Sequence, residues 1–168
     1  MFGQRSVVLR GRAALVVRRF SNFSDLRSTP LYGDRLMLVC NVGHDLAGRR
    51  EVEWRELCNE PLILLRQGSG LRSLVDKAFS RWSRKIEPVY EVSQVATALG
   101  LVEVGEGISI LPSYAISRAL SASRETRVAT VALVSPVVRR EIVALTRLAD
   151  VLEAPGMDFV DHFKEVVA

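Results

Sequence analysis

Cysteine and histidine are scarce in this chain of 168 residues, which holds two of each. Cys40 and Cys58 lie in apolar surroundings at a spacing that suits no zinc motif, so we expect small buried thiols in a reducing compartment. His44 and His162 lie far apart in the sequence. This shortage of ligating side chains argues against a metal site, and we expect no cofactor.

Long apolar runs are missing as well. No stretch reaches the roughly 18 apolar residues that a membrane-spanning helix needs. Arg10 and Arg12 interrupt the apolar core that a signal peptide requires, and the Arg-rich start resembles a transit peptide only superficially. The run "AALVV" at 13–17 suits a buried strand equally well. We therefore expect a cytoplasmic protein with no membrane partner.

Acidic side chains are absent from residues 1–19, which contain five arginines. The whole chain has 23 Lys and Arg against 19 Asp and Glu, a net charge of +4. Without residues 1–19 the balance is 18 basic against 19 acidic side chains. The basic character therefore belongs to the N-terminal segment, and the folded body lacks the electrostatic footprint of a DNA-binding surface.

Apolar runs alternate with helical patterns along the chain, which predicts an α/β architecture with mostly parallel strands. The expected strands are 13–17, 34–42, 62–66, 87–92, 108–112, 128–133 and 140–147. The expected helices are 53–61, 71–83, 94–104, 113–120 and 157–168. Turn chemistry that ends at Pro30 predicts a loop over 18–30.

The stretch "GLVEVGEGISILPSY" at 100–114 raises the question of a phosphate-binding loop. Such a loop follows a strand and opens a helix, whereas this one follows a helix and precedes a strand. We interpret Gly105 as the left-handed residue that ends the helix, and Gly107 as a tight turn into the strand. Ser109 is no nucleophile elbow, because position 111 is leucine instead of glycine.

Catalytic side chains do not assemble into a recognisable set. Neither His44 nor His162 joins a Ser/His/Asp or Cys/His arrangement, and no carboxylate pair has a spacing suited to acid–base chemistry. Glu51, Glu53 and Glu56 have the pattern of a solvated face. An enzyme is therefore the least favoured class of function.

Polar residues follow two of the expected strands where a helix begins. In "QGSG" at 67–70, Ser69 and the N–H groups of the helix start are suited to hold a carboxylate or similar anion, unless Ser69 only caps the helix. Ser93, interpreted as an N-cap, repeats this arrangement with Gln94 and Thr97. These two side chains either line a ligand crevice at the strand ends or form a solvated helix face. Both interpretations stay open.

The order of these pieces resembles the effector-binding domain of LysR-type transcriptional regulators. "LYGDRLMLV" at 31–39 fits a strand pattern L-x-x-D/E-R-L-x-L-V, and "HDLA" at 44–47 fits H-x-L-A, although Asp45 replaces the usual proline. "ALGLVEVGEGISILP" at 98–112 fits ALGLV-x-x-G-x-G-I-x-x-L-P. The resemblance covers about residues 13–168.

This resemblance implies a two-lobed fold of the type II periplasmic-binding-protein kind, with a small-molecule inducer between the lobes and assembly into homo-oligomers. Residues 36–140 would form a complete second lobe, and 13–35 with 141–168 a partial first lobe. Residues 1–12 match nothing and are expected to be a flexible tail. The family's winged helix-turn-helix is not found in this sequence, so we expect an N-terminally truncated domain that reaches DNA only through that absent part.

The resemblance also assigns effector-binding positions from both lobes. They are Ser69, Gly70, Leu71, Ser93, Gln94, Thr97 and Arg18. We hypothesise that Arg18 approaches Gln94 across the cleft, and that the inducer is a carboxylate or an aromatic acid. Two alternatives are a stand-alone cytoplasmic binding protein and a non-functional fragment of a disrupted regulator gene.

Overall fold

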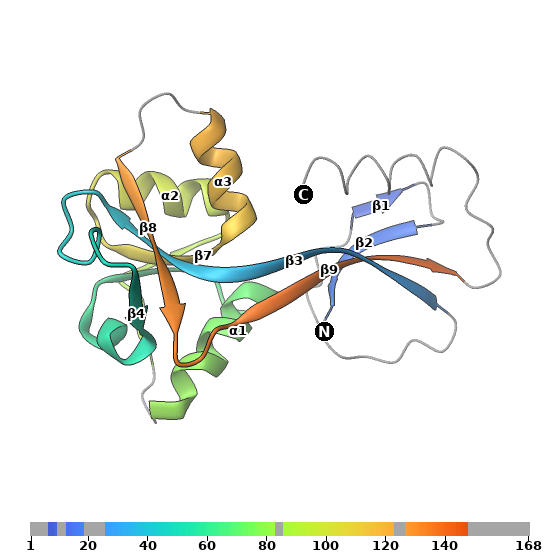
Figure 1. Cartoon of the computed structure of the whole chain (residues 1–168), viewed down its shortest axis with the longest axis horizontal. Helices are drawn as coiled ribbons and strands as arrows, with labels where there is room; N and C mark the ends of the chain where they lie inside the picture. The colour runs from blue at the N-terminus through green and yellow to red at the C-terminus, as the bar shows by residue number, and fades with distance from the viewer. Residues whose placement is uncertain (1–6, 10–12, 19–25, 83–85, 123–126, 148–168) are drawn as a thin grey trace. The chain divides into compact units, whose positions relative to one another are not determined.

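The computed structural model describes residues 7–9, 13–18, 26–82, 86–122 and 127–147, which form two compact units (Figure 1). Unit 1 comprises Met1–Asp34 and Arg139–Ala168, and unit 2 comprises Arg35–Val138. From the sequence alone, the corresponding boundaries fall after residues 35 and 140. Each unit is described by itself.

Unit 2 is built on a mixed sheet in which the strands follow the order β4, β8, β3, β7, β5, β6. The strands are β3 (Leu26–Asn41), β4 (Glu51–Glu53), β5 (Leu62–Leu65), β6 (Tyr90–Val92), β7 (Ile108–Pro112) and β8 (Val128–Val134). β5 runs parallel to both β6 and β7, and β4 runs parallel to β8. β3 runs antiparallel to both β7 and β8.

Three of the five pairings in this sheet are parallel, as expected, and the exception is β3, which is antiparallel to both of its neighbours in unit 2. Strands that are buried on both faces have the same continuous apolar pattern whichever way they run, so the pattern does not report direction. In β3, Leu38 lies opposite Ile110 of β7 and Val131 of β8, and all three are buried. Direction is fixed by these tertiary pairings.

Helices flank this sheet and connect its parallel strands. They are α1 (Gly70–Phe79), α2 (Val95–Glu103) and α3 (Ser113–Ala122), with two 3-10 helices, η1 (Trp54–Asn59) and η2 (Ser80–Trp82). In Figure 1, α2 and α3 lie on one side of β7 and β3, and α1 lies on the other. The Trp54 and Phe79 rings meet edge to face with centroids 5.3 Å apart, which joins η1 to α1 in the core.

Several elements match the residues expected from the sequence. The strand at 108–112 agrees residue for residue, and all five of its residues are buried. The short helix expected at 53–61 is present as the 3-10 helix η1, which begins after Glu53, the last residue of β4, and ends at Asn59. The expected loop over 18–30 is wrong in its last part, because β3 begins at Leu26 and runs through Pro30. Strand formation there depends on tertiary context more than on intrinsic preference. The expected helix at 157–168 lies outside the described residues.

In unit 1, β1 (Val7–Leu9) pairs antiparallel with β2 (Ala13–Arg18), and β2 pairs antiparallel with β9 (Arg139–Arg147). β9 is also hydrogen-bonded to β3, whose residues 26–34 belong to this unit. β1 lies within residues 1–12, to which the sequence assigned no strand. A buried ion pair joins the last residue of the first segment to β9. Nε and Nη2 of Arg140 both lie 2.7 Å from Oδ2 of Asp34, whose side chain is fully buried. Burial of these charges is tolerated because each has its opposite in direct contact.

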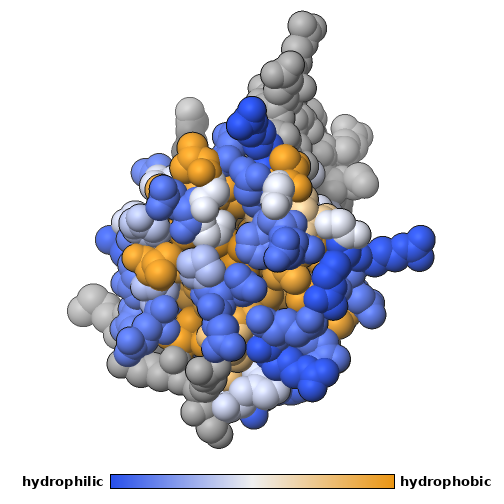
Figure 2. Space-filling view, turned by 90° about the vertical axis from the view of Figure 1, so that its left-hand side faces the viewer, coloured by the Kyte–Doolittle hydropathy of each residue, from blue (hydrophilic) through white to orange (hydrophobic). Residues whose placement is uncertain are grey.

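Hydrophobic side chains at the surface are dispersed. Figure 2 shows that on the face it presents the coloured hydrophobic residues form small patches between hydrophilic ones. Among the described residues, the exposed large hydrophobic side chains are Val42, Val89, Tyr90, Val104 and Val137. Within the described residues, no helix is long and apolar enough to cross a membrane.

The end of α2 confirms the interpretation of the two glycines. Gly105 has a φ of +86°, its N–H donates to Val102 O at 3.0 Å, and that of Glu106 donates to Leu101 O at 3.0 Å. These two bonds form a Schellman motif, which satisfies the last carbonyl groups of the helix. Gly107, with a φ of +155°, then brings the chain against Pro61.

We expect Gly107→Ala to destabilise the protein more than Gly105→Ala. A Cβ at Gly107 would lie 2.3 Å from the carbonyl oxygen of Pro61, whereas one at Gly105 would meet nothing within 4 Å. Gly105→Ala is expected to cost about 1–2 kcal/mol for its left-handed backbone, and Gly107→Ala about 3 kcal/mol or more. The free energies of unfolding in urea measure this difference, and equal losses would contradict it.

The two thiols differ in accessibility. Cys40 is fully buried, and burial raises the pKa of its thiol above the ordinary value, whereas Cys58 is half-buried. Because the thiolate is the reacting species, we expect Ellman's reagent at about pH 8 to modify Cys58 in the folded protein well before Cys40. In urea the two rates should converge. Cys40→Ser and Cys58→Ser variants assign the signal, and a native Cys40 that reacts as fast as Cys58 would contradict the buried position.

Candidate functional site

Two helices begin side by side at the carboxyl ends of β5 and β6. Leu65, the last residue of β5, lies opposite Val92, the last residue of β6, and the two strands are parallel. The N–H of Arg66 donates to Val92 O at 2.9 Å, which ties the two chain exits together. We call residues 66–71 and 93–97 the carboxyl edge. In α/β sheets this is the end at which ligands bind.

The start of α1 is closed by Ser69. Its Oγ accepts a hydrogen bond from the N–H of Arg72 at 3.0 Å, and its carbonyl oxygen accepts one from Oγ of Ser73 at 3.2 Å. The capping interpretation of Ser69 is thus confirmed, and its hydroxyl proton remains for donation. Gly70 is exposed, whereas the side chain of Leu71 belongs to the core. An effector at this loop would therefore meet backbone and the Ser69 hydroxyl.

The start of α2 differs from the expectation. Ser93 was expected to be the N-cap, which is wrong: Gln94 occupies that position, with an extended backbone and no side-chain capping bond. The helix begins at Val95, one residue later than a Ser93 cap requires, and the N–H of Ala98 donates to Gln94 O. Ser93, Gln94 and Thr97 are all exposed. The chain thus presents their polar groups at the surface of the carboxyl edge.

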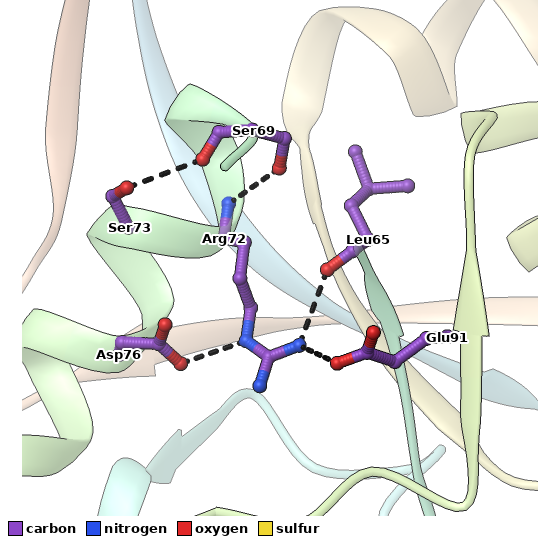
Figure 3. Close-up of polar contacts among 6 residues, drawn as sticks. All are labelled: Leu65, Ser69, Arg72, Ser73, Asp76 and Glu91. Carbon is purple, nitrogen blue, oxygen red and sulfur yellow. Dashed lines mark hydrogen bonds and ion pairs between the residues drawn. The ribbon is translucent and has the colours of Figure 1, made fainter. Parts of the chain in front are cut away.

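Arg72 is the one buried cation at this edge among the described residues, with a side chain only 3% exposed (Figure 3). Its Nε donates to Oδ1 of Asp76 at 2.8 Å, and its Nη1 donates to Oε1 of Glu91 at 2.7 Å and to Leu65 O at 3.3 Å. Burial lowers the pKa of Arg72, but the bonds to Asp76 and Glu91 outweigh it and hold that pKa above the ordinary value. Arg72 therefore stays charged, and two carboxylates in direct contact with it more than balance its charge.

The sequence patterns did not single out this network. Arg72 and Asp76 carried one signal, since residues four apart lie next to each other on a helix. Glu91 carried none, because it is 19 residues from Arg72 and reaches it only through the pairing of β5 with β6.

Arg18, the remaining predicted effector-binding residue, belongs to unit 1. Its backbone ends β2 in unit 1, where it lies opposite Glu141 of β9, and its side chain is outside the described residues. Gln94 belongs to unit 2. The expected approach of these two residues stays a prediction.

Other candidate groups have structural partners. Ser109 is fully buried and donates to Ile63 O at 2.7 Å, which links β7 to β5. Nδ1 of His44 accepts from the N–H of Leu46, and its Nε2 lies 3.5 Å from Glu60. Across the described part of the chain, no group of three or more His, Cys, Asp or Glu residues is placed to hold a metal ion.

The cap at Ser69 can be tested by its removal. Ser69→Ala is expected to lower the free energy of unfolding by about 1 kcal/mol, because the N–H of Arg72 loses its acceptor. Ser80→Ala is the matched control at the other end of α1, where an exposed hydroxyl donates to Lys77 O, and it should cost about 0.5 kcal/mol or less. Urea unfolding measures both, and equal effects would contradict the assigned cap.

Comparison with known proteins identifies the family. The model of the LysR substrate binding domain matches residues 6–168. The HTH-type transcriptional regulator YbhD of Escherichia coli (strain K12) is 37% identical over 135 residues, which are 80% of this chain and 41% of YbhD. This chain thus spans less than half the length of that relative.

Solved structures give the fold. The CcmR regulatory domain of Synechocystis PCC6803, in complex with 2-PG, superposes with a TM-score of 0.76 at 20% identity, over 93% of this chain and 73% of that one. The effector binding domain of QuiR, in complex with shikimate, gives 0.70 at 23% identity, over 91% and 71%. The two units thus have the type II periplasmic-binding-protein-like fold that the sequence predicted, and the chain belongs to the LysR substrate binding domain family.

Proposed function

We propose that this chain is the effector-sensing part of a LysR-type transcriptional regulator, and that the carboxyl edge is where unit 2 contacts the effector. The observation that carries the proposal is the meeting of two helix starts at one end of the sheet, with exposed Ser93, Gln94 and Thr97 beside the Ser69 loop. Family membership supports it, and YbhD, a transcriptional regulator, supports a regulatory role over a catalytic one.

The chemistry of the edge favours a small hydroxylated or aromatic carboxylate. The first N–H groups of an α-helix have no partners within the helix. In α1 the N–H of Arg72 donates to the Ser69 hydroxyl, so the N–H groups of Gly70 and Leu71 remain for solvent or a ligand. The positive ends of two helix dipoles favour an anion at this position. Hydroxyl and amide side chains add neutral hydrogen bonds. The ligands of CcmR and QuiR, 2-PG and shikimate, are the first compounds to try.

The remaining elements of the proposal concern the whole regulator. Arg18 of unit 1 contributes to the same effector, and the domain assembles with further copies of itself. DNA is bound through a helix-turn-helix domain, as the designation of YbhD indicates for that relative. Such a regulator acts in the cytoplasm.

Binding can be tested by thermal shift followed by calorimetry, with shikimate, 2-PG and benzoate as probes. At least one of these carboxylates is expected to raise the melting temperature, because a ligand that binds only the folded state stabilises it. Gln94→Ala and Thr97→Val should each weaken that binding about tenfold, the equivalent of one hydrogen bond of about 1.4 kcal/mol.

Thr130→Val is the matched control, because Thr130 is an exposed threonine on β8, outside the carboxyl edge. It should leave the affinity unchanged. The proposal fails if no probe shifts the melting temperature, or if both variants at the edge bind as tightly as the parent protein.

A further inference from the structure

Arg72 connects three elements that together carry the carboxyl edge. Its side chain starts from the first turn of α1, its Nη1 donates to the last carbonyl group of β5, and the same Nη1 donates to Glu91 in β6 (Figure 3). Through its backbone N–H, the same residue is bound to the Ser69 hydroxyl at 3.0 Å. One residue thus holds the loop on one side and the ends of two strands on the other.

This network is more than a surface ion pair. Exposed pairs contribute little to stability, but Arg72 is 3% exposed while its partners Asp76 and Glu91 are 47% and 42% exposed. Removal of Glu91 leaves Arg72 paired with Asp76 alone and takes the carboxylate acceptor from its buried Nη1, so the surrounding backbone must adjust or admit water. The backbone nearest to the guanidinium is that of Leu65 and of the first turn of α1.

We propose that Arg72 is a positioning residue for the effector: it fixes the first turn of α1 against the ends of β5 and β6 and so aims Ser69 and the N–H groups of Gly70 and Leu71. It does not bind the effector itself, because its side chain is 3% exposed, its Nε and Nη1 donate to Asp76, Glu91 and Leu65 O, and the two carboxylates more than balance its charge. This inference rests on the proposed function, since the aimed groups are those proposed to bind the ligand.

Glu91→Ala separates this role from direct binding, because the two predict opposite signs. If Arg72 positions the loop, loss of Glu91 loosens it and lowers the affinity for the carboxylate probe, by about tenfold. If Arg72 bound the ligand itself, loss of the competing carboxylate would free its charge and raise that affinity. Glu51→Ala is the matched control, since Glu51 is an exposed glutamate in the three-residue strand β4, away from the edge.

Arg72→Met and its control Arg49→Met complete the set. Arg49 forms an exposed ion pair with Glu56 at 2.6 Å, so its loss removes a similar contact without disturbing the edge. We expect Arg72→Met to weaken binding at least as much as Glu91→Ala, and Arg49→Met to leave it unchanged. If Arg72→Met does not fold, Glu91→Ala still decides the question.

Hydrogen exchange in the ligand-free protein supplies a second readout that a general loss of stability would not mimic. In Glu91→Ala the amides of Arg72 and Ser73, which donate to Ser69, should exchange faster, while those of α2 and β7 keep their protection. An unchanged or increased affinity in Glu91→Ala overturns the inference, and so does a loss of stability with neither affinity nor local protection altered. If the parent protein binds none of the three probes, the proposed function itself fails.

Discussion

The parallel pairing of β5 with β6 is the constraint on which the candidate site depends. Because the two strands run in the same direction, the helices that follow them, α1 and α2, begin at the same end of the sheet. The register sets Leu65 opposite Val92, and the hydrogen bond from the N–H of Arg66 to Val92 O holds the ends of the two strands at the same position along the sheet. With either strand reversed, Ser69 and Gln94 would lie at opposite ends of the sheet, and no ligand would reach both.

The electrostatics of the edge follow from this geometry. Two parallel strands bring a glutamate of β6 next to the first turn of α1, and Arg72 fills the space between them with a charge that the protein itself balances. The anionic ligand that we propose for this edge would be met by helix N–H groups and neutral side chains, without the desolvation of a free buried cation. In unit 1, Asp34 and Arg140 follow the same rule, since each buried charge is in contact with its opposite.

The sequence was most informative where the signal was local. The Schellman motif at Gly105 follows from the glycine and the apolar periodicity before it, and the Ser69 cap follows from a serine at a strand-to-helix junction. The predicted N-cap of α2 was wrong, because Ser93 has good capping chemistry but the N-cap is the next residue, Gln94. The predicted loop was also wrong at residues 26–30, where pairing extends a strand through a segment with turn composition.

The sequence by itself determined which segments are buried, where most helices and strands lie, and which family the ordered motifs resemble, because burial and capping leave periodic and local marks. Only the tertiary structure decided strand direction, the cap of α2 and the partnership of Arg72 with Glu91. These depend on which distant segments become neighbours, and an apolar strand has the same pattern beside any partner. The serines and glycines of the carboxyl edge could therefore be identified from the sequence, whereas the role of Arg72 became evident only from the pairing of β5 with β6.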